Sequence, residues 1–225
     1  VDYATVLTVA KCKDALMAGF TTFRDAGSVS EGLKLAFDEG VLPGPRIYPC
    51  GAYISQTCGH GDSEYAHTYR DIQYRHPSST VLVDGVPEII RAVREQFYRG
   101  ASHIKLMATE ILNRHEDIRL LFGTDMMITG PDYQVEQSED IRYYEKRFGT
   151  MRALRALTGT ANEVFALTTY QNPYPKGKIG VLEAGSYADL LLVDGDPTKS
   201  VLVLADTDHL RLIMKGGTVY KNTLC

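Results

Sequence analysis

The sequence predicts an α/β fold built on a parallel sheet or barrel and followed by a small unit of β-strands. Short strands alternate with amphipathic helices over residues 1–167, which is the pattern of repeated βα units. After Leu167 the chain changes to short apolar strands with Gly and Asp at the bends. We therefore expect two domains, a partial (β/α) unit over residues 1–167 and strands of a smaller β domain over residues 168–225.

The first third of the chain shows the alternation most clearly. Tyr3, Val6, Leu7 and Ala10 have helical spacing, and Gly19 marks the end of that helix. The elements expected after it are a strand at 21–24, a helix at 31–39 closed by Gly40, and a strand at 46–49. Residues 55–79 are polar and irregular, so we expect a long loop there.

The alternation continues through the middle of the chain. One helical stripe is formed by Val86, Ile89, Ile90, Val93 and Phe97, and Gly100 ends it. The elements expected next are a strand at 104–108, a short helix at 111–116, a strand at 118–122 and, after a polar loop, a helix at 154–165. In the tail we expect strands at 178–185 and 188–194, and a hairpin of 209–214 with 218–221 around Gly216-Gly217.

Composition excludes several function classes. The net charge of -4 argues against a surface for nucleic acid or anionic membrane. No apolar run approaches the length that spans a bilayer. The four cysteines form no CxxC pair, which favours free thiols over a disulfide framework or a zinc cluster. No signal peptide is visible, so a cytoplasmic location is favoured, although the first residues already have a helical pattern, as though the natural start were missing.

Two apolar stretches carry an ionisable residue and suggest a site. Lys105 lies within the strand-like stretch 100–109, and Asp125 directly follows the stretch 121–124. Burying a charge costs several kcal/mol unless it is paired or bound to a metal. The plainer alternatives are a lysine that extends to solvent from a strand end and an aspartate that caps a turn or helix. His60 and Asp62, in a glycine-rich stretch, either line a pocket or are ordinary loop residues.

Several motifs, in order along the chain, resemble those of a known enzyme family. They are Ala18–Asp25, Gly44–Arg46, Ser55–Asp62, Gly100–Thr109, Phe122–Asp125, Gly185–Leu191 and Met214–Tyr220. Together they resemble the metal-dependent amidohydrolases, in the branch of prolidase-like, imidazolonepropionase-like and ochratoxin-hydrolysing enzymes. The resemblance covers most of the chain.

The resemblance implies a (β/α)8 TIM-type barrel with a small β-sandwich and two divalent metal ions, with zinc expected, at the carboxyl ends of the strands. It implies that Lys105 is carboxylated and bridges both metals, and that Asp125 binds one metal and accepts a proton from the bridging water. His60 and Asp62 would contact substrate. The implied activity is hydrolysis of carbon–nitrogen bonds in a small-molecule amide, dipeptide or cyclic amide by a homo-oligomer.

The chain also departs from the family pattern. It contains no His-x-His pair, which the family places on its first strand, and four histidine ligands have no counterpart. Only about four barrel strands are expected, around Thr22, Ile47, Lys105 and Leu121, whereas a complete barrel takes about 250 residues. Either the sequence is part of a longer protein or it is an internally deleted relative. The alternative function is a non-catalytic α/β remnant that acts as a binding or scaffold protein without metal.

Overall fold

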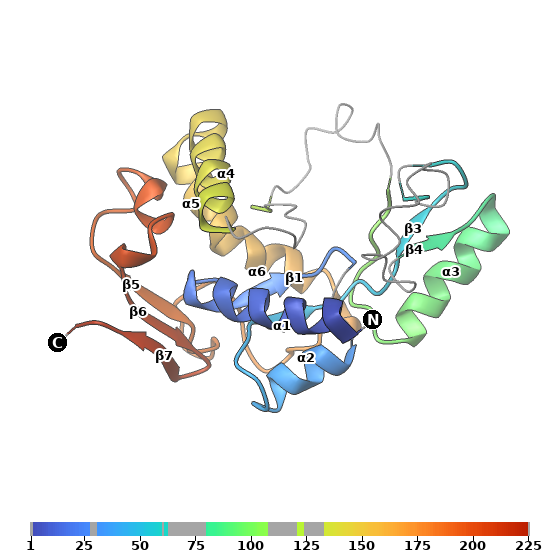
Figure 1. Cartoon of the computed structure of the whole chain (residues 1–225), viewed down its shortest axis with the longest axis horizontal. Helices are drawn as coiled ribbons and strands as arrows, with labels where there is room; N and C mark the ends of the chain where they lie inside the picture. The colour runs from blue at the N-terminus through green and yellow to red at the C-terminus, as the bar shows by residue number, and fades with distance from the viewer. Residues whose placement is uncertain are drawn as a thin grey trace.

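The computed structural model describes residues 2–27, 31–59, 61–62, 80–107, 121–123 and 133–224. The described part is mixed α/β, with helices packed beside short parallel strands (Figure 1). Helix α3 (Val86–Tyr98) and a C-terminal antiparallel sheet lie at opposite ends of the long axis of the molecule. Among the described residues, no helix is long and apolar enough to cross a membrane.

The first elements confirm the predicted alternation. They are α1 (Asp2–Met17), β1 (Thr22–Arg24), α2 (Glu31–Asp38) and β2 (Arg46–Tyr48). Gly19 and Gly40 follow the two helices at φ values of 93° and 73°, a conformation that glycine adopts without strain. β1 and β2 pair in parallel, with Phe23 opposite Ile47, so β1, α2 and β2 form one βαβ unit.

The core of this unit follows from the helical spacing of α2. Leu33 and Phe37, four residues apart, lie on the face of α2 that is buried against Cys12 of α1 and Ile47 of β2. A side chain at Gly44 would clash with Phe37, because its Cβ would lie 2.4 Å from the ring. The motif glycine therefore lets the chain enter β2 directly beneath α2.

A second parallel pair continues the same chain path. β3 (Tyr53–Ser55) pairs with β4 (Thr80–Leu82), and Leu106 forms a parallel bridge to Ile54 on the other side of β3. β3 was not predicted, and the expected strand at 104–108 is reduced to this single bridge within the described residues. Residues 63–79, most of the predicted long loop, lie outside the described residues.

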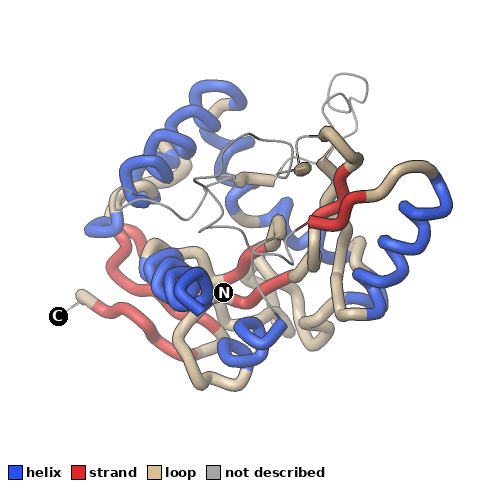
Figure 2. The backbone as a smooth tube through the Cα atoms, turned by 45° about the vertical axis from the view of Figure 1, so that its right-hand side comes forward, coloured by secondary structure: helices blue, strands red, loops and turns tan. Residues whose placement is uncertain are grey.

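Helix α3 confirms the predicted helix, and it lies beside the β3–β4 pair (Figure 2). Its apolar stripe is buried only in part. Val86, Ile89 and Ile90 are 68%, 40% and 45% exposed. Val93 of the same stripe packs, together with the buried Ala92, against Ile54 of β3. The helix therefore contacts the strands through its middle, and the first turn of the stripe lies outside this contact.

The predicted single helix at 154–165 is two helices, preceded by a third that the sequence analysis assigned to a polar loop. They are α4 (Tyr133–Phe148), α5 (Thr150–Leu157) and α6 (Gly159–Ala166). Gly149, at a φ of 81°, separates α4 from α5, and Thr158 breaks the helix between α5 and α6. The predicted helix at 111–116 lies outside the described residues. Of the predicted strand at 118–122, only Leu121 and Phe122 are described, and they are not in a strand.

The tail forms one antiparallel sheet. Its strands are β5 (Leu190–Val193), β6 (Leu210–Lys215) and β7 (Thr218–Asn222), in the order β5-β6-β7. Gly216 and Gly217, at φ values of 58° and 82°, make the predicted hairpin turn. The predicted strand at 178–185 is wrong, since that segment is irregular. In the described part of the chain the tail contributes a single sheet, and the parallel strands form two separate pairs, so the closed barrel and the sandwich stay predictions.

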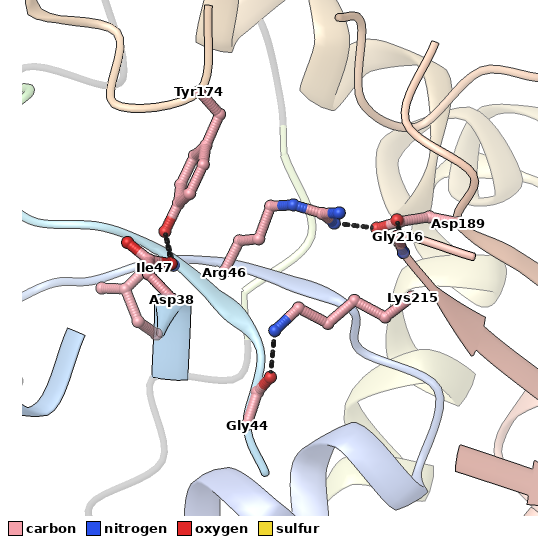
Figure 3. Close-up of polar contacts among 8 residues, drawn as sticks. All are labelled: Asp38, Gly44, Arg46, Ile47, Tyr174, Asp189, Lys215 and Gly216. Atoms are coloured by element: carbon pink, nitrogen blue, oxygen red, sulfur yellow. Dashed lines mark hydrogen bonds and ion pairs between the residues drawn. The ribbon is translucent and has the colours of Figure 1, made fainter. Parts of the chain in front are cut away.

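The tail packs directly on the α/β part (Figure 3). The guanidinium of Arg46, at the start of β2, pairs with the carboxylate of Asp189, which also accepts a 2.8 Å hydrogen bond from the backbone N–H of Gly216. The ammonium of Lys215 donates to the carbonyl of Gly44. Two segments that lie more than 140 residues apart in sequence are therefore joined at β2.

A second set of contacts holds the next residues of the same strand. Tyr174 accepts a 2.9 Å hydrogen bond from the backbone N–H of Ile47 and donates a 2.8 Å bond to Asp38 (Figure 3). The ring of Tyr48 stacks on Phe165 of α6, with centroids 4.0 Å apart. β2 is thus the strand on which α2, α6 and the C-terminal segment converge.

Candidate functional site

The candidate site lies where β1, β2 and the segment 101–107 reach their carboxyl ends. The backbone N–H of Asp25 donates to the carbonyl of Tyr48 at 2.9 Å. The backbone N–H of Ser102 donates to the next carbonyl, that of Pro49, at 2.7 Å. Successive carbonyls of a strand point to opposite sides, so β2 lies between β1 and the segment that carries Lys105. In α/β folds ligands bind at this carboxyl edge.

Gly51 turns the chain sharply just after β2. Its φ is 68°, and a Cβ on this residue would lie 2.4 Å from the side-chain oxygen of Gln96. That oxygen accepts a 2.9 Å hydrogen bond from the backbone N–H of Ala52, and Gln96 is only 2% exposed. The buried amide of α3 therefore fixes the turn by which β2 continues into β3.

The thiol of Cys50 contacts the carboxylate of Asp25 at this edge. The sulfur lies 3.7 Å from Oδ2 of Asp25, and both residues are buried. Burial raises the pKa of Cys50 to about 12, the negative charge of Asp25 adds to the rise, and the positive charges of Arg24 and Lys105 oppose it. Cys50 is therefore a neutral thiol that donates a hydrogen bond to the Asp25 carboxylate, rather than a nucleophile.

His103 reaches across β2 to the end of β1. Its Nε2 lies 2.9 Å from the backbone carbonyl of Asp25, and its Nδ1 lies 3.1 Å from the hydroxyl of Ser102. Because a carbonyl only accepts, the neutral ring carries its proton on Nε2. Burial lowers the pKa of His103 to about 4, and the charge of Arg24 acts in the same direction. The ring is neutral near pH 7, and its Nε2 donates to a protein carbonyl.

Lys105 lies two residues after His103, partly buried, on the segment that flanks β3. Its backbone carbonyl accepts a 2.9 Å hydrogen bond from the N–H of Ile54, and the N–H of Met107 donates to the carbonyl of Ile54 at 3.0 Å. The positive charge of Lys105 is among those that oppose the rise in the pKa of Cys50. The structure thus describes the backbone of the predicted lysine beside β3, and its role as a ligand stays a prediction.

Of the other predicted site residues, the structure describes only Asp62. Asp125 and His60 lie outside the described residues. The carboxylate of Asp62 accepts a 2.7 Å hydrogen bond from the backbone N–H of Cys58, and its own N–H donates to the carbonyl of Gly59 at 2.9 Å. Asp62 therefore closes a turn of the 56–62 loop, as the plainer alternative stated, and its role toward substrate stays a prediction.

Sequence reasoning left the thiol of Cys50 and the amide of Gln96 unnoticed. Neither carries a charge, and the search rested on ionisable residues in apolar strands. One signal for Cys50 was present, because it lies two residues after the end of β2, and Asp25 lies directly after the end of β1. Position at a carboxyl strand end would have selected it where charge did not.

The described residues do not by themselves complete a metal site. Among them, no three His, Cys, Asp or Glu side chains are close enough to hold an ion. His103 does not offer a free ring nitrogen, since Nε2 faces the Asp25 carbonyl and Nδ1 faces Ser102. Of the expected ligands, only Lys105 lies in the described part of the chain. A metal at this edge would require further ligands from elsewhere.

Comparison with known structures shows the fold. A prolidase complexed with N-methylphosphonate-L-proline matches with a TM-score of 0.68 at 21% identity, over 96% of this chain and 79% of that one. An amidohydrolase matches with a TM-score of 0.71 at 21% identity over the same shares of the two chains. The ochratoxinase of A. niger matches with a TM-score of 0.69 at 18% identity, over 98% of this chain and 76% of that one.

Comparison of sequences shows the family. Ochratoxinase from Aspergillus niger is 37% identical over 108 residues, which are 44% of this chain. The match spans 22% of the length of that curated relative. Residues 2–116, which include the whole candidate edge from Asp25 to Lys105, match the pattern of the Amidohydrolase family. The chain belongs to the Amidohydrolase family.

Proposed function

We propose that this protein is a metal-dependent hydrolase of carbon–nitrogen bonds in small amides, dipeptides or cyclic amides. The observation that carries the proposal is the position of Lys105, which is partly buried on the segment that runs from Ser102 beside Pro49 to Ile54 of β3, in a member of the Amidohydrolase family. A partly buried lysine on this segment is suited to a ligand or substrate role, because solvent does not fully satisfy its charge.

The proposal assigns roles to four residues. Lys105, as a carbamate, and Asp125 would hold two divalent ions, with zinc the expected metal. Asp125 would also accept a proton, and His60 and Asp62 would contact substrate. When bound, two such ions supply hydroxide near neutral pH and polarise the scissile carbonyl. The remaining ligands would come from residues outside the described part or from chain that this sequence does not contain.

The similar proteins suggest the substrate class. They include a prolidase bound to a proline phosphonate, an Xaa-Pro dipeptidase with bound methionine, and ochratoxinases. We infer that the substrate here is likewise a small molecule with an amide bond, rather than a nucleic acid or a membrane lipid. A homo-oligomeric state and a cytoplasmic location belong to the same proposal.

Metal content and turnover, measured side by side, test the proposal. The probes are Xaa-Pro dipeptides, N-acetyl amino acids and ochratoxin, with and without added zinc. We expect Lys105→Ala to abolish turnover and short carboxylates to restore part of it. We expect Asp125→Asn to lower turnover by roughly 10²–10⁴-fold, the usual contribution of general acid–base catalysis, with substrate binding changed much less. The control is Lys178→Ala, on an exposed ion pair of the tail.

Two outcomes would contradict the proposal. Wild-type turnover in Lys105→Ala would remove the lysine from the site. A wild-type protein that binds no metal and hydrolyses no probe would favour the non-catalytic alternative. The intact mass of the natural protein, compared with the 25.0 kDa of this chain, would show whether further chain could supply the ligands.

A further inference from the structure

Cys50 and His103 both bond to Asp25 at the candidate edge, the thiol to its carboxylate and the imidazole to its backbone carbonyl. Asp25 is 5% exposed and takes part in three hydrogen bonds that join separate strands. Its N–H donates to Tyr48, its carboxylate accepts from Cys50, and its carbonyl accepts from His103. A carboxylate this deeply buried is retained only where its hydrogen bonds and nearby charges compensate the loss of water.

The third of these bonds spans the whole width of β2. His103 belongs to the segment on one side of β2, and Asp25 ends the strand on the other side. The bond between them crosses over β2. Ser102 holds the same segment to Pro49 by its backbone N–H, which donates to the Pro49 carbonyl at 2.7 Å. The single hydroxyl proton of Ser102 is shared between that carbonyl, at 3.0 Å, and Nδ1 of His103, at 3.1 Å.

The His103 bond is one of a small number of contacts that hold the segment carrying Lys105. The segment 101–107 has only one bridge to β3, at Leu106, and no continuous ladder over the described residues. Two backbone hydrogen bonds to Ile54 hold Lys105 and Met107 directly, while the bonds of Ser102 and His103 hold the residues just before them. With so little regular pairing, each of these bonds contributes to the position of the segment.

We infer that Asp25, Cys50 and His103 form a positioning set that holds the Lys105 segment against β1 and β2. The set acts through the backbone of Lys105, and none of its members is assigned a contact with substrate. Its value for catalysis rests on the proposed hydrolase function, but the geometry it maintains does not.

Two amide substitutions at His103 distinguish the bond to Asp25 from the other contacts of the imidazole ring. His103→Gln carries an N–H donor near the position of Nε2 and can still reach the Asp25 carbonyl. His103→Asn carries its amide near the position of Nδ1, keeps a polar group beside Ser102 and falls short of Asp25. Both variants remove the ring, so the difference between them isolates the bond to Asp25.

The first readout is amide hydrogen exchange of peptides that cover residues 103–107, in the full chain. We expect exchange in His103→Asn to be faster by roughly three- to tenfold, the range for one lost hydrogen bond, and exchange in His103→Gln to stay near wild type. The second readout is the rate at which an amine reagent modifies Lys105, followed by mass spectrometry. This modification rate should differ from the wild-type rate in His103→Asn and be close to the wild-type rate in His103→Gln.

His209 supplies the matched control. Its Nδ1 also lies within hydrogen-bond distance of a backbone carbonyl, that of Asp194, at 2.6 Å in the tail. Because this bond uses Nδ1, His209→Gln, whose amide lies near the position of Nε2, removes it and should leave exchange and labelling at Lys105 unchanged. Should either His103 variant fail to fold, Cys50→Ala removes the thiol bond to Asp25 and should raise exchange over the same peptide, whereas Cys50→Ser should restore it.

The outcomes keep the two proposals apart. Equal exchange and equal Lys105 labelling in the Asn, Gln and wild-type proteins would overturn the positioning set, whatever the activity. A wild-type protein without hydrolase activity, but with the expected Asn–Gln difference, would refute the proposed function and leave the positioning set supported. If the enzyme is active, kcat should fall more than KM rises in His103→Asn, because a misplaced lysine affects chemistry more than binding.

Discussion

The buried pair of Arg46 and Asp189 offers the sharpest test of how the tail is joined to the α/β part. Each side chain is only 7% exposed. Arg46→Ala leaves the Asp189 carboxylate buried with its hydrogen bond from Gly216 but without its cation. It also removes the guanidinium that lies 4.2 Å from the ring centroid of Tyr187.

The expected cost follows from that burial. Breaking one partner of a buried ion pair lowers the free energy of unfolding by about 3–5 kcal/mol, because the other charge stays out of water. A domain is stable by only about 5–15 kcal/mol, so this loss is a large share of the total. Asp189→Asn keeps an oxygen for the Gly216 N–H but leaves Arg46 unpaired, and its cost should fall in the same range.

Urea unfolding followed by far-ultraviolet circular dichroism measures these changes, since the chain has no tryptophan to report by fluorescence. The double variant should cost less than the sum of the single variants by about 1–3 kcal/mol, the coupling of residues in contact. Lys178→Ala serves as the control, because Lys178 and Glu183 form an ion pair with both side chains more than half exposed. It should change stability by less than about 1 kcal/mol.

An Arg46→Ala variant that loses less than about 1 kcal/mol would refute the reasoning, because that is the value of an exposed pair. An additive double variant would do the same, because it would show that the two side chains do not act together.

Two further predictions concern the helices and the tail. The isolated segment 176–225 should be unfolded or aggregated, because it is too short to bury much core and β6 is buried partly against the rest of the chain. Sharp, dispersed amide signals in an NMR spectrum of this segment would contradict the prediction. Burial acts to raise the pKa of Glu145, but hydrogen bonds from Thr150, Ser200 and Val201 lower it below its ordinary value of 4.5. The stabilisation that ionised Glu145 gives to the fold is therefore complete above pH 4.5. It is lost as the pH falls through the lower pKa of the folded state. Glu145→Gln should therefore lower stability at pH 7 and weaken the loss below pH 4.5 in acid titrations followed by circular dichroism, whereas the exposed Glu139→Gln should do neither.

The parts of the fold that could be predicted are those in which local signals agree. Gly19 and Gly40 end their helices, and Leu33 and Phe37 show the buried face of α2 by their spacing. The Gly216-Gly217 turn likewise agrees with the apolar strands beside it. Each of these features depends on residues within a few positions of one another, which is the range that sequence patterns describe.

The errors arose where distant residues decide the outcome. α4 is highly charged and has few apolar residues, yet Ile141 packs against Ala153 of α5 and Val201, which are not its neighbours in sequence. β3 has three residues, too few to show a period, and exists because β4 and Leu106 lie on either side of it. The first part of the α3 stripe is the reverse case, because Val86, Ile89 and Ile90 follow a strong local pattern and yet are exposed in the described structure.

The same division applies to the site. Lys105 was found because a charge in an apolar strand is costly, and that argument needs only the local sequence. The contacts among Asp25, Cys50 and His103 join three segments and involve a thiol and a backbone carbonyl, which no charge pattern reveals. Asp125, found by the same local argument, lies outside the described residues and stays a prediction.

These contacts give β2 a particular role. Its first residue, Arg46, is held by Asp189 of the tail, and its next two residues contact Tyr174 and Phe165. Just beyond its other end, Pro49 and Cys50 hold the Lys105 segment and Asp25. A strand of three residues cannot keep its position by ladder hydrogen bonds alone. The C-terminal sheet therefore stabilises the strand from which the candidate site is built, and sites on well-supported elements hold their geometry better than sites on loops.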